Sequence, residues 1–239
     1  NGRRWERKSA PDLVDDGRIG YNGKTMKYHI QTYGCQMNYS DSERVTTVLA
    51  KMGYERGTGF ADSDLIILNT CSVKQKAHDR IYGLGEQFQE LKQKNPNLRI
   101  GITGCMAQGT GGRGQVKDDT LARMETVDFV FKIKDLMRLP AILTRFHPVE
   151  GADEVKDMLS YFHISPTLTN IAQVYIPIMS GCNNYCSFCI VPYTRGKEIC
   201  RDMGEMIEEV QKHVKRGATE VNLVGQNVNS YKPNDADSK

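Results

Sequence analysis

Seven cysteines are the residues of this chain whose side chains point most directly to chemistry. Cys182, Cys186 and Cys189 follow one another with a Cys-x3-Cys-x2-Cys spacing inside a single predicted loop. Thiolates at this spacing can bind three of the four irons of a 4Fe–4S cube. The fourth iron then keeps an open coordination position, which distinguishes a reactive metal centre from a closed structural one. Such an iron can bind the amino and carboxylate groups of S-adenosylmethionine.

A zinc knuckle is the alternative interpretation of this loop. Structural zinc needs a fourth Cys or His ligand at close spacing. The nearest candidate is Cys200, eleven residues after Cys189, and His213 lies deeper in the predicted helix. The spacing therefore favours the iron–sulfur interpretation, and Cys200 is treated as a spare thiol.

A second set of thiols is spread over the N-terminal half of the chain. Cys35, Cys71 and Cys105 lie 36 and 34 residues apart, and each directly follows a predicted strand. In a parallel sheet the carboxyl ends of the strands lie at one edge, where ligands bind. The three thiols are expected to meet at that edge and to hold a metal cluster. The strands are predicted at residues 27–33, 65–68 and 99–103.

Predicted helices alternate with these strands. Ser40 and Glu43 form a capping-box pattern, which predicts a helix that begins there and ends at Gly53. Apolar residues from Ala77 to Leu91 recur at spacings of four, three, four and three, which predicts one continuous helix. The alternation of strand and helix is typical of a parallel α/β sheet. A fourth strand is predicted at residues 127–131, and a last helix, limited by Pro140, at residues 135–146.

The sequence divides into four parts. Residues 1–25 are polar and mixed in charge and are expected to form a flexible tail, and residues 26–146 carry the α/β pattern. Residues 147–170, with two prolines and little periodicity, are interpreted as a linker. Residues 171–239 predict one βαβ unit. Its strands are expected at 173–179 and 220–224, and its helix at 204–216 with Met206, Ile207, Val210 and Val214 facing inward.

Composition indicates a soluble globular protein, with 39% hydrophobic residues, 26% charged residues and a net charge of +3. No apolar run approaches the ~18–20 residues that cross a bilayer, and the N-terminal segment has no signal-peptide core. We therefore expect a cytoplasmic protein without a membrane partner, in which thiols serve as ligands rather than disulfides. The mildly basic charge permits a nucleic-acid partner without requiring one.

Two further patterns have ordinary interpretations. Gly109–Gly114 formally matches the dinucleotide pattern G-x-G-x-x-G, but the following residues predict only a modest helix, so a flexible surface loop is expected. Arg195, Lys197 and Arg201 form a basic stretch, which is interpreted as solvated surface that could also meet nucleic-acid phosphates.

The segments around both cysteine sets resemble the radical S-adenosylmethionine methylthiotransferase family. The resemblance covers residues 26–231 and is specific, because all the motif groups occur in the family's order. It implies a three-layer N-terminal methylthiotransferase domain with a parallel sheet, followed by the first βαβ part of a radical-SAM (β/α)6 open barrel. The matching segments are residues 32–38, 68–72, 104–108, 181–196 and 223–231.

The resemblance also implies a division of labour between two 4Fe–4S clusters. Cys182, Cys186 and Cys189 would hold the cluster that cleaves S-adenosylmethionine to a 5′-deoxyadenosyl radical. Cys35, Cys71 and Cys105 would hold the cluster that carries the sulfur to be inserted. Phe188 would contribute its backbone to adenine binding, and Gln226 and Asn227 would line the cofactor pocket. No side chain is assigned a role in acid–base catalysis. The C2–H bond of the target adenine is neither acidic nor electrophilic, so the cofactor has to supply the chemistry that breaks it.

The residues after the first cysteine indicate the substrate. Gln36-Met37 resembles the branch that methylthiolates N(6)-isopentenyladenosine next to the anticodon of tRNA. Branches that act on a ribosomal-protein aspartate or on threonylcarbamoyladenosine usually have Pro-Lys or Lys-Val there, and both remain alternatives. A non-enzymatic iron–sulfur or zinc-binding module is a third alternative.

The expected partners are tRNA and an electron donor such as a flavodoxin or ferredoxin. The chain itself is expected to be a monomer. Since the family's barrel and RNA-binding domain need more chain, these 239 residues alone are expected to be nearly inactive.

Overall fold

The computed structural model describes residues 25–71, 75–107, 124–146 and 161–233. Nearly all of the predicted tail, the loop Gly109–Gly114 and the first part of the predicted linker lie outside these ranges. Among the described residues, no helix combines the length and the apolar character that crossing a membrane requires.

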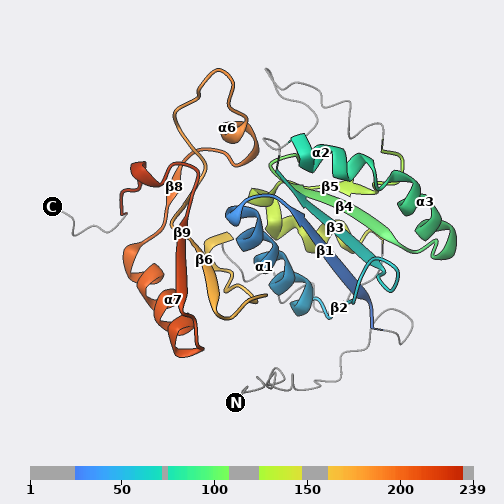
Figure 1. Cartoon of the computed structure of the whole chain (residues 1–239), viewed down its shortest axis with the longest axis horizontal. Helices are drawn as coiled ribbons and strands as arrows, with labels where there is room; N and C mark the ends of the chain where they lie inside the picture. The colour runs from blue at the N-terminus through green and yellow to red at the C-terminus, as the bar shows by residue number, and fades with distance from the viewer. Residues whose placement is uncertain (1–24, 72–74, 108–123, 147–160, 234–239) are drawn as a thin grey trace, which may run out of the picture.

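The N-terminal part is built on a five-stranded sheet with the order β2-β1-β3-β4-β5 (Figure 1). All its neighbouring strands are parallel. The central strand β3 is buried along its whole length, as its continuous apolar run predicts for a strand covered on both faces. The strands are β1 (Lys27–Tyr33), β2 (Glu55–Arg56), β3 (Leu65–Thr70), β4 (Arg99–Gly104) and β5 (Phe129–Val130).

Helical layers cover both faces of this sheet, which confirms the three-layer α/β prediction (Figure 1). On one face, α1 packs Val48 and Leu49 against Ile67 of β3. On the other face, Ile81 and Phe88 pack against strand residues such as Ile102. The helical elements are α1 (Gln36–Lys51), α2 (Gln75–Tyr82), α3 (Gly85–Lys94), the 3-10 helix η2 (Ile133–Arg138) and α5 (Leu139–Leu143).

The predicted start of the first helix is wrong. Cys35, and not Ser40, stands at the N-cap of α1, where the side chain of Asn38 accepts a hydrogen bond from the Cys35 N–H at 3.1 Å. Ser40 and Glu43 lie inside the helix and are buried. Their side chains bind the backbone of residues more than a hundred positions away, Tyr175 and Thr169, rather than the helix end.

Two other helix predictions need correction. The helix expected from Ala77 to Leu91 is broken between α2 and α3 at Gly83-Leu84, where glycine lowers helix propensity. The last helix begins as the 3-10 helix η2 and continues as α5, and Pro140 lies in the first turn of α5. Proline is tolerated there because the first turn has no intrahelical partner for its missing N–H. Pro140 therefore starts α5 rather than limiting it.

The C-terminal part pairs β6 (Gln173–Pro177) with β9 (Glu220–Val224) in parallel and packs α7 (Met203–Lys215) on them, which is the predicted βαβ unit. Asp202 caps α7 by accepting the Glu205 N–H at 3.0 Å. Met206 is buried in this core and Val210 is partly buried, but Ile207 and Val214 are exposed, so their predicted inward placement is wrong. Two strands are too narrow a surface to cover that whole apolar face. The remaining elements are η3 (Tyr161–His163), β7 (Met179–Ser180), α6 (Val191–Thr194), β8 (Ile199–Cys200) and η4 (Val228–Ser230).

Candidate metal centres

The N-terminal thiols lie at the carboxyl edge of the large sheet. The Cys71 N–H donates to the Tyr33 carbonyl at 2.9 Å, and the Cys105 N–H donates to the Thr70 carbonyl at 2.9 Å. Cys35 begins α1 just after β1. Three neighbouring parallel strands, β1, β3 and β4, thus deliver one thiol each to the same edge.

A buried pair of asparagines fixes this edge. The Asn38 amide donates to the Asn69 side-chain carbonyl at 2.9 Å, and the Asn69 amide donates to the Asn38 backbone carbonyl at 2.8 Å and to Ser42 Oγ at 2.9 Å. Both side chains are fully buried. They join the first turn of α1, next to Cys35, to the end of β3, next to Cys71. Sequence reasoning missed this pair, although an asparagine directly after the apolar run of a buried strand was a usable signal.

Gly104 sets the position of the third thiol. Its φ of +91° lies in the region that favours glycine, and a Cβ there would come within 2.4 Å of the Thr70 carbonyl oxygen. The close approach of β4 to β3 at this point holds Cys105 beside Cys71. A residue with a side chain does not fit without a backbone shift.

The chemistry of the donors suits an iron–sulfur site. All three thiols are free, with Cys71 and Cys105 buried and Cys35 partly exposed. Soft thiolates in a protected setting are the usual ligands of such clusters. In the described ranges, however, no three Cys, His, Asp or Glu side chains are grouped at metal-binding spacing. The residues fit a cluster by type and by position in the fold, and the thiols are not already gathered around one point.

The second thiol set lies on the loop between β7 and α6. The Cys182 N–H donates to the Gly196 carbonyl at 3.2 Å, so the start of the loop is tied to the residues that follow α6. Cys182 is buried, Cys189 is partly exposed and Cys186 is exposed. Phe188, between two of the thiols, is 91% exposed and contacts no core. The loop is thus anchored near the buried Cys182, and it exposes Cys186, and Cys189 in part, to solvent.

Gln226 and Asn227 follow β9, at the base of the same loop. The side-chain oxygen of Gln226 accepts the Gly181 N–H at 2.6 Å, next to the first thiol. The Asn227 backbone carbonyl accepts hydrogen bonds from Ser230 at 2.9 Å. Gln226 therefore supports the cysteine loop directly, and Asn227 shapes the turn that follows the strand.

Comparisons with known proteins identify both parts. Residues 27–131 match the family described as Uncharacterized protein family UPF0004, and residues 176–239 match the Radical SAM superfamily. A tRNA-2-methylthio-N(6)-dimethylallyladenosine synthase from Dictyoglomus thermophilum is 41% identical over 208 residues, which are 86% of this chain and 46% of the relative. Proteins of the same name from Alkaliphilus oremlandii and Mycobacteroides abscessus are 38% and 41% identical, over 94% and 88% of this chain.

The chain belongs to the family of these proteins. This confirms the resemblance to radical S-adenosylmethionine methylthiotransferases, and the chain corresponds to the N-terminal portion of such a protein. The chain spans less than half the length of these relatives, 46%, 47% and 41% in the order given.

Within this family member, the two thiol-bearing parts meet at a buried ion pair. Arg195, which follows the cysteine loop, donates two N–H groups to the carboxylate of Asp41 in α1, at 2.5 and 3.3 Å. Its Nε donates to Cys105 Sγ at 3.4 Å. Burial raises the pKa of the Cys105 thiol, and the Arg195 charge, which favours the thiolate, offsets part of that rise.

The basic stretch is not the solvated surface that the sequence predicts. Arg195 is 4% exposed and Arg201 is 5% exposed, and only Lys197 remains on the surface. Arg201 is held by Glu209 of α7 at 2.5 Å. Sequence reasoning missed both carboxylate partners. Asp41 lies 154 positions before Arg195, and no local pattern links residues so far apart.

Helix α1 carries further contacts between the two parts. Ser40 Oγ donates to the Tyr175 carbonyl at 3.2 Å, and the rings of Tyr39 and Tyr175 stack at 6.2 Å. The fully buried Arg44 lies 3.6 Å from Glu209 of α7. In Figure 1 the C-terminal part accordingly lies alongside α1. This helix therefore fixes how the two thiol sets are placed relative to one another.

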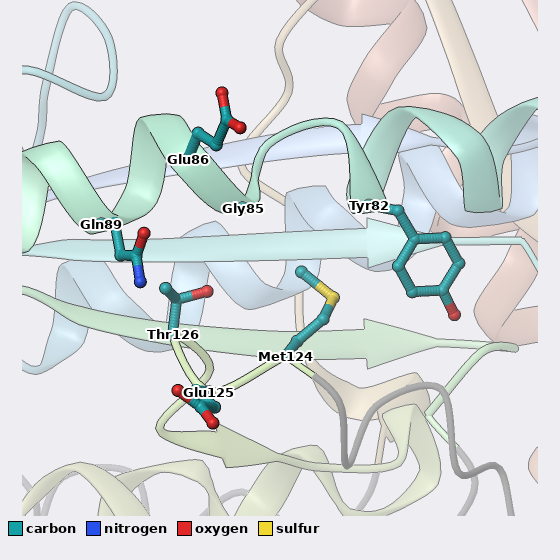
Figure 2. A pocket seen from close by; sticks show the side chains of 7 residues that line it. All are labelled: Tyr82, Gly85, Glu86, Gln89, Met124, Glu125 and Thr126. Carbon is teal, nitrogen blue, oxygen red and sulfur yellow. The ribbon is translucent and has the colours of Figure 1, made fainter.

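A pocket of about 530 Å³ lies elsewhere in the N-terminal part, between α3 and the residues that precede β5 (Figure 2). Among the described residues that line it there is no thiol and no arginine, and two carboxylates give it an acidic character. It is therefore separate from both cysteine sets. Its lining residues are Tyr82, Gly85, Glu86, Gln89, Met124, Glu125 and Thr126.

Proposed function

We propose that this chain is the N-terminal portion of a radical S-adenosylmethionine enzyme that methylthiolates C2 of N(6)-isopentenyladenosine next to the anticodon in tRNA. The observation that carries the proposal is the junction at Arg195, which joins the cysteine loop of one part to Cys105 of the other. Two thiol sets that are tied together suit a reaction in which one centre generates a radical and the other supplies sulfur.

The proposal assigns two 4Fe–4S clusters and S-adenosylmethionine as cofactors. When bound, these groups supply reductive cleavage of S-adenosylmethionine and the sulfur and methyl of the product. Cys182, Cys186 and Cys189 would hold the first cluster, and Cys35, Cys71 and Cys105 the second. The chain's other residues position these ligands. Gln226 fixes the backbone next to Cys182, and the asparagine pair fixes the strand end before Cys71.

Two exposed or polar groups near the loop are proposed to meet S-adenosylmethionine. Phe188 is held between two thiols with its ring in solvent, which leaves its backbone available to the adenine. Asn227, beside Gln226, would line the same pocket. We assign no acid or base to this reaction, because no side chain can ionise an unactivated aromatic C–H bond of the substrate.

The relatives named above are tRNA-modifying synthases, which supports tRNA as the substrate of this chain. We further propose an electron donor such as a flavodoxin or ferredoxin, a monomeric state and a cytoplasmic location. The proposed organisation is a tail at 1–25, a methylthiotransferase domain at 26–146, a linker at 147–170 and an incomplete radical-SAM domain at 171–239. Residues 161–170 of that linker pack on α1, where Thr169 binds Glu43 at 3.1 Å.

The test uses a fusion, because the chain spans less than half of its relatives. Residues 1–231 are joined in frame to the remaining part of the Dictyoglomus thermophilum relative and reconstituted without oxygen. The fusion is incubated with S-adenosylmethionine, a reductant and tRNA that carries isopentenyladenosine. Mass spectrometry of the nucleosides should detect 2-methylthio-N(6)-isopentenyladenosine, and Cys182→Ala and Cys35→Ala should each abolish it.

Parallel reactions separate the other outcomes. Product on threonylcarbamoyladenosine tRNA or on ribosomal protein, with none on isopentenylated tRNA, overturns the substrate. Bound metal without any cleavage of S-adenosylmethionine overturns the enzyme class. The 239-residue chain by itself should form almost no product, and robust turnover by it contradicts the expectation that more chain is needed.

A further inference from the structure

We propose that Arg195 is a positioning residue that holds the cysteine loop against Cys105 and directs a positive charge at that sulfur, with Asp41 as its anchor. This inference rests on the proposed function and deepens it. It assigns to one arginine the coupling between the two thiol sets.

The geometry of Arg195 leaves its guanidinium little freedom. Two of its N–H groups bind the Asp41 carboxylate, and its Nε binds Cys105 Sγ at 3.4 Å. Asp41 is itself fully buried and accepts a hydrogen bond from the Tyr161 hydroxyl at 2.6 Å. A planar guanidinium matches a carboxylate with two parallel N–H groups, which a lysine ammonium cannot do.

The backbone around Arg195 is tied to the first thiol of the radical-SAM loop. The Arg195 N–H donates to the Val191 carbonyl at 2.9 Å, which closes the short helix α6. The next residue, Gly196, accepts the Cys182 N–H at 3.2 Å. A continuous path of two hydrogen bonds, joined by the peptide bond between Arg195 and Gly196, therefore runs from Cys182 to Cys105. A shift of this arginine moves one thiol set relative to the other.

The charge at this place favours the same role. Hydrogen bonds and positive charge directed at a ligating sulfur are among the factors that set the reduction potential of a thiolate-bound cluster. A buried arginine without its carboxylate would be strongly destabilising, because an uncompensated charge would remain in the protein interior. The Asp41 pair therefore allows a cation to stay buried beside Cys105. Arg44 and Arg201, which are also buried, make no such contact to a thiol among their described interactions.

A metal-free experiment tests the positioning role in the 239-residue chain. Cys105 is 9% exposed, so alkylation must wait for local opening of the junction. Loss of charged hydrogen bonds should raise the population of the open form, and hence the labelling rate of Cys105, by about tenfold or more. Mass spectrometry should detect this acceleration in Arg195→Gln, Arg195→Lys and Asp41→Asn, with no change at the exposed Cys186.

Lys132→Met is the matched control. Lys132 makes another contact across the junction, to the Tyr193 carbonyl at 3.4 Å, but that bond is exposed and touches no thiol. Its loss should leave the Cys105 rate within about twofold of wild type. Circular dichroism identifies any variant that has unfolded. If Arg195→Gln unfolds, Arg195→Lys, which keeps the charge, decides the question. Wild-type labelling of Cys105 in the folded Arg195 variants overturns the proposal.

A second readout separates a positioning and electrostatic role from a merely structural one. In the reconstituted chain, Arg195→Gln should shift the midpoint potential of the cluster at Cys105 to a more negative value, and Arg195→Lys should restore part of the shift. An unchanged potential in both variants contradicts the charge assignment. If wild-type chain binds no cluster that depends on Cys105, the proposed function itself fails, and the labelling experiment still judges the positioning role independently.

Discussion

Replacing Gly104 by alanine should destabilise the N-terminal part and displace Cys105. The φ of +91° at this position disfavours any residue with a Cβ by about 1–2 kcal/mol. In addition, the new Cβ would lie 2.4 Å from the Thr70 carbonyl oxygen and 2.5 Å from the Asn69 side-chain oxygen. Forcing atoms into a packed site typically costs about 1–3 kcal/mol. Together these effects predict a loss of about 2–5 kcal/mol in the free energy of unfolding.

Gly53 provides a matched control in the same part of the chain. Its φ is +78°, but a Cβ placed there meets nothing within 4 Å. Gly53→Ala should therefore show only the backbone effect, about 1–2 kcal/mol. Urea denaturation of both variants as reduced, metal-free chains, followed by circular dichroism, measures the difference. Equal stability of the two variants would refute the argument that close packing of β4 on β3 holds Cys105 in place.

Three further predictions concern the core and its charges. Asn69→Leu should lower the free energy of unfolding by about 2–3 kcal/mol in urea denaturation, because Asn38 and Ser42 lose buried partners. Asn97→Ala, at an exposed turn, is the control and should change the free energy of unfolding by less than about 0.5 kcal/mol in the same experiment. Phe88→Ala should cost about 3–5 kcal/mol, since its ring is fully buried under α3, and a smaller loss would show that this face collapses around the gap. Burial lowers the pKa of His213 below its ordinary 6.5, so the unfolded chain takes up the proton first and stability should fall as the pH drops from about 7 to 5.5. His213→Met should reduce that slope in urea titrations at several pH values, and an unchanged slope would assign it to other groups.

The sheet was predictable because its strands carry local signals. Leu65–Leu68 is a continuous apolar run, which is typical of a strand buried on both faces in the middle of a parallel sheet. Once the strands were placed in order, the shared edge of Cys35, Cys71 and Cys105 followed from the topology alone. Both candidate thiol sets could therefore be proposed from the sequence.

The start of α1 was not predictable from its capping pattern. Ser40 and Glu43 have the residue types and the spacing of a capping box, but tertiary contacts use both side chains elsewhere. Asn38 ends up supporting the helix start at Cys35 instead. Local capping preferences amount to only about 1 kcal/mol, and several buried hydrogen bonds outweigh them.

The buried arginines were missed for a different reason. A run of basic residues after a reactive loop is usually solvated, and Lys197 follows that rule. Arg195 does not, because its partner Asp41 lies on a helix of the other part of the chain. Contacts between parts that are distant in sequence leave no periodic pattern. The junction therefore became visible only in the structure.

Quantifying iron and sulfide in chain reconstituted without oxygen tests the central claim most directly. The wild-type chain should contain enough of both for two 4Fe–4S clusters. Cys182→Ala and Cys35→Ala should each lose one cluster's worth, and Cys200→Ala should lose none. A chain that binds zinc without sulfide, or that never holds more than one cluster, would contradict the existence of two separate thiolate sites.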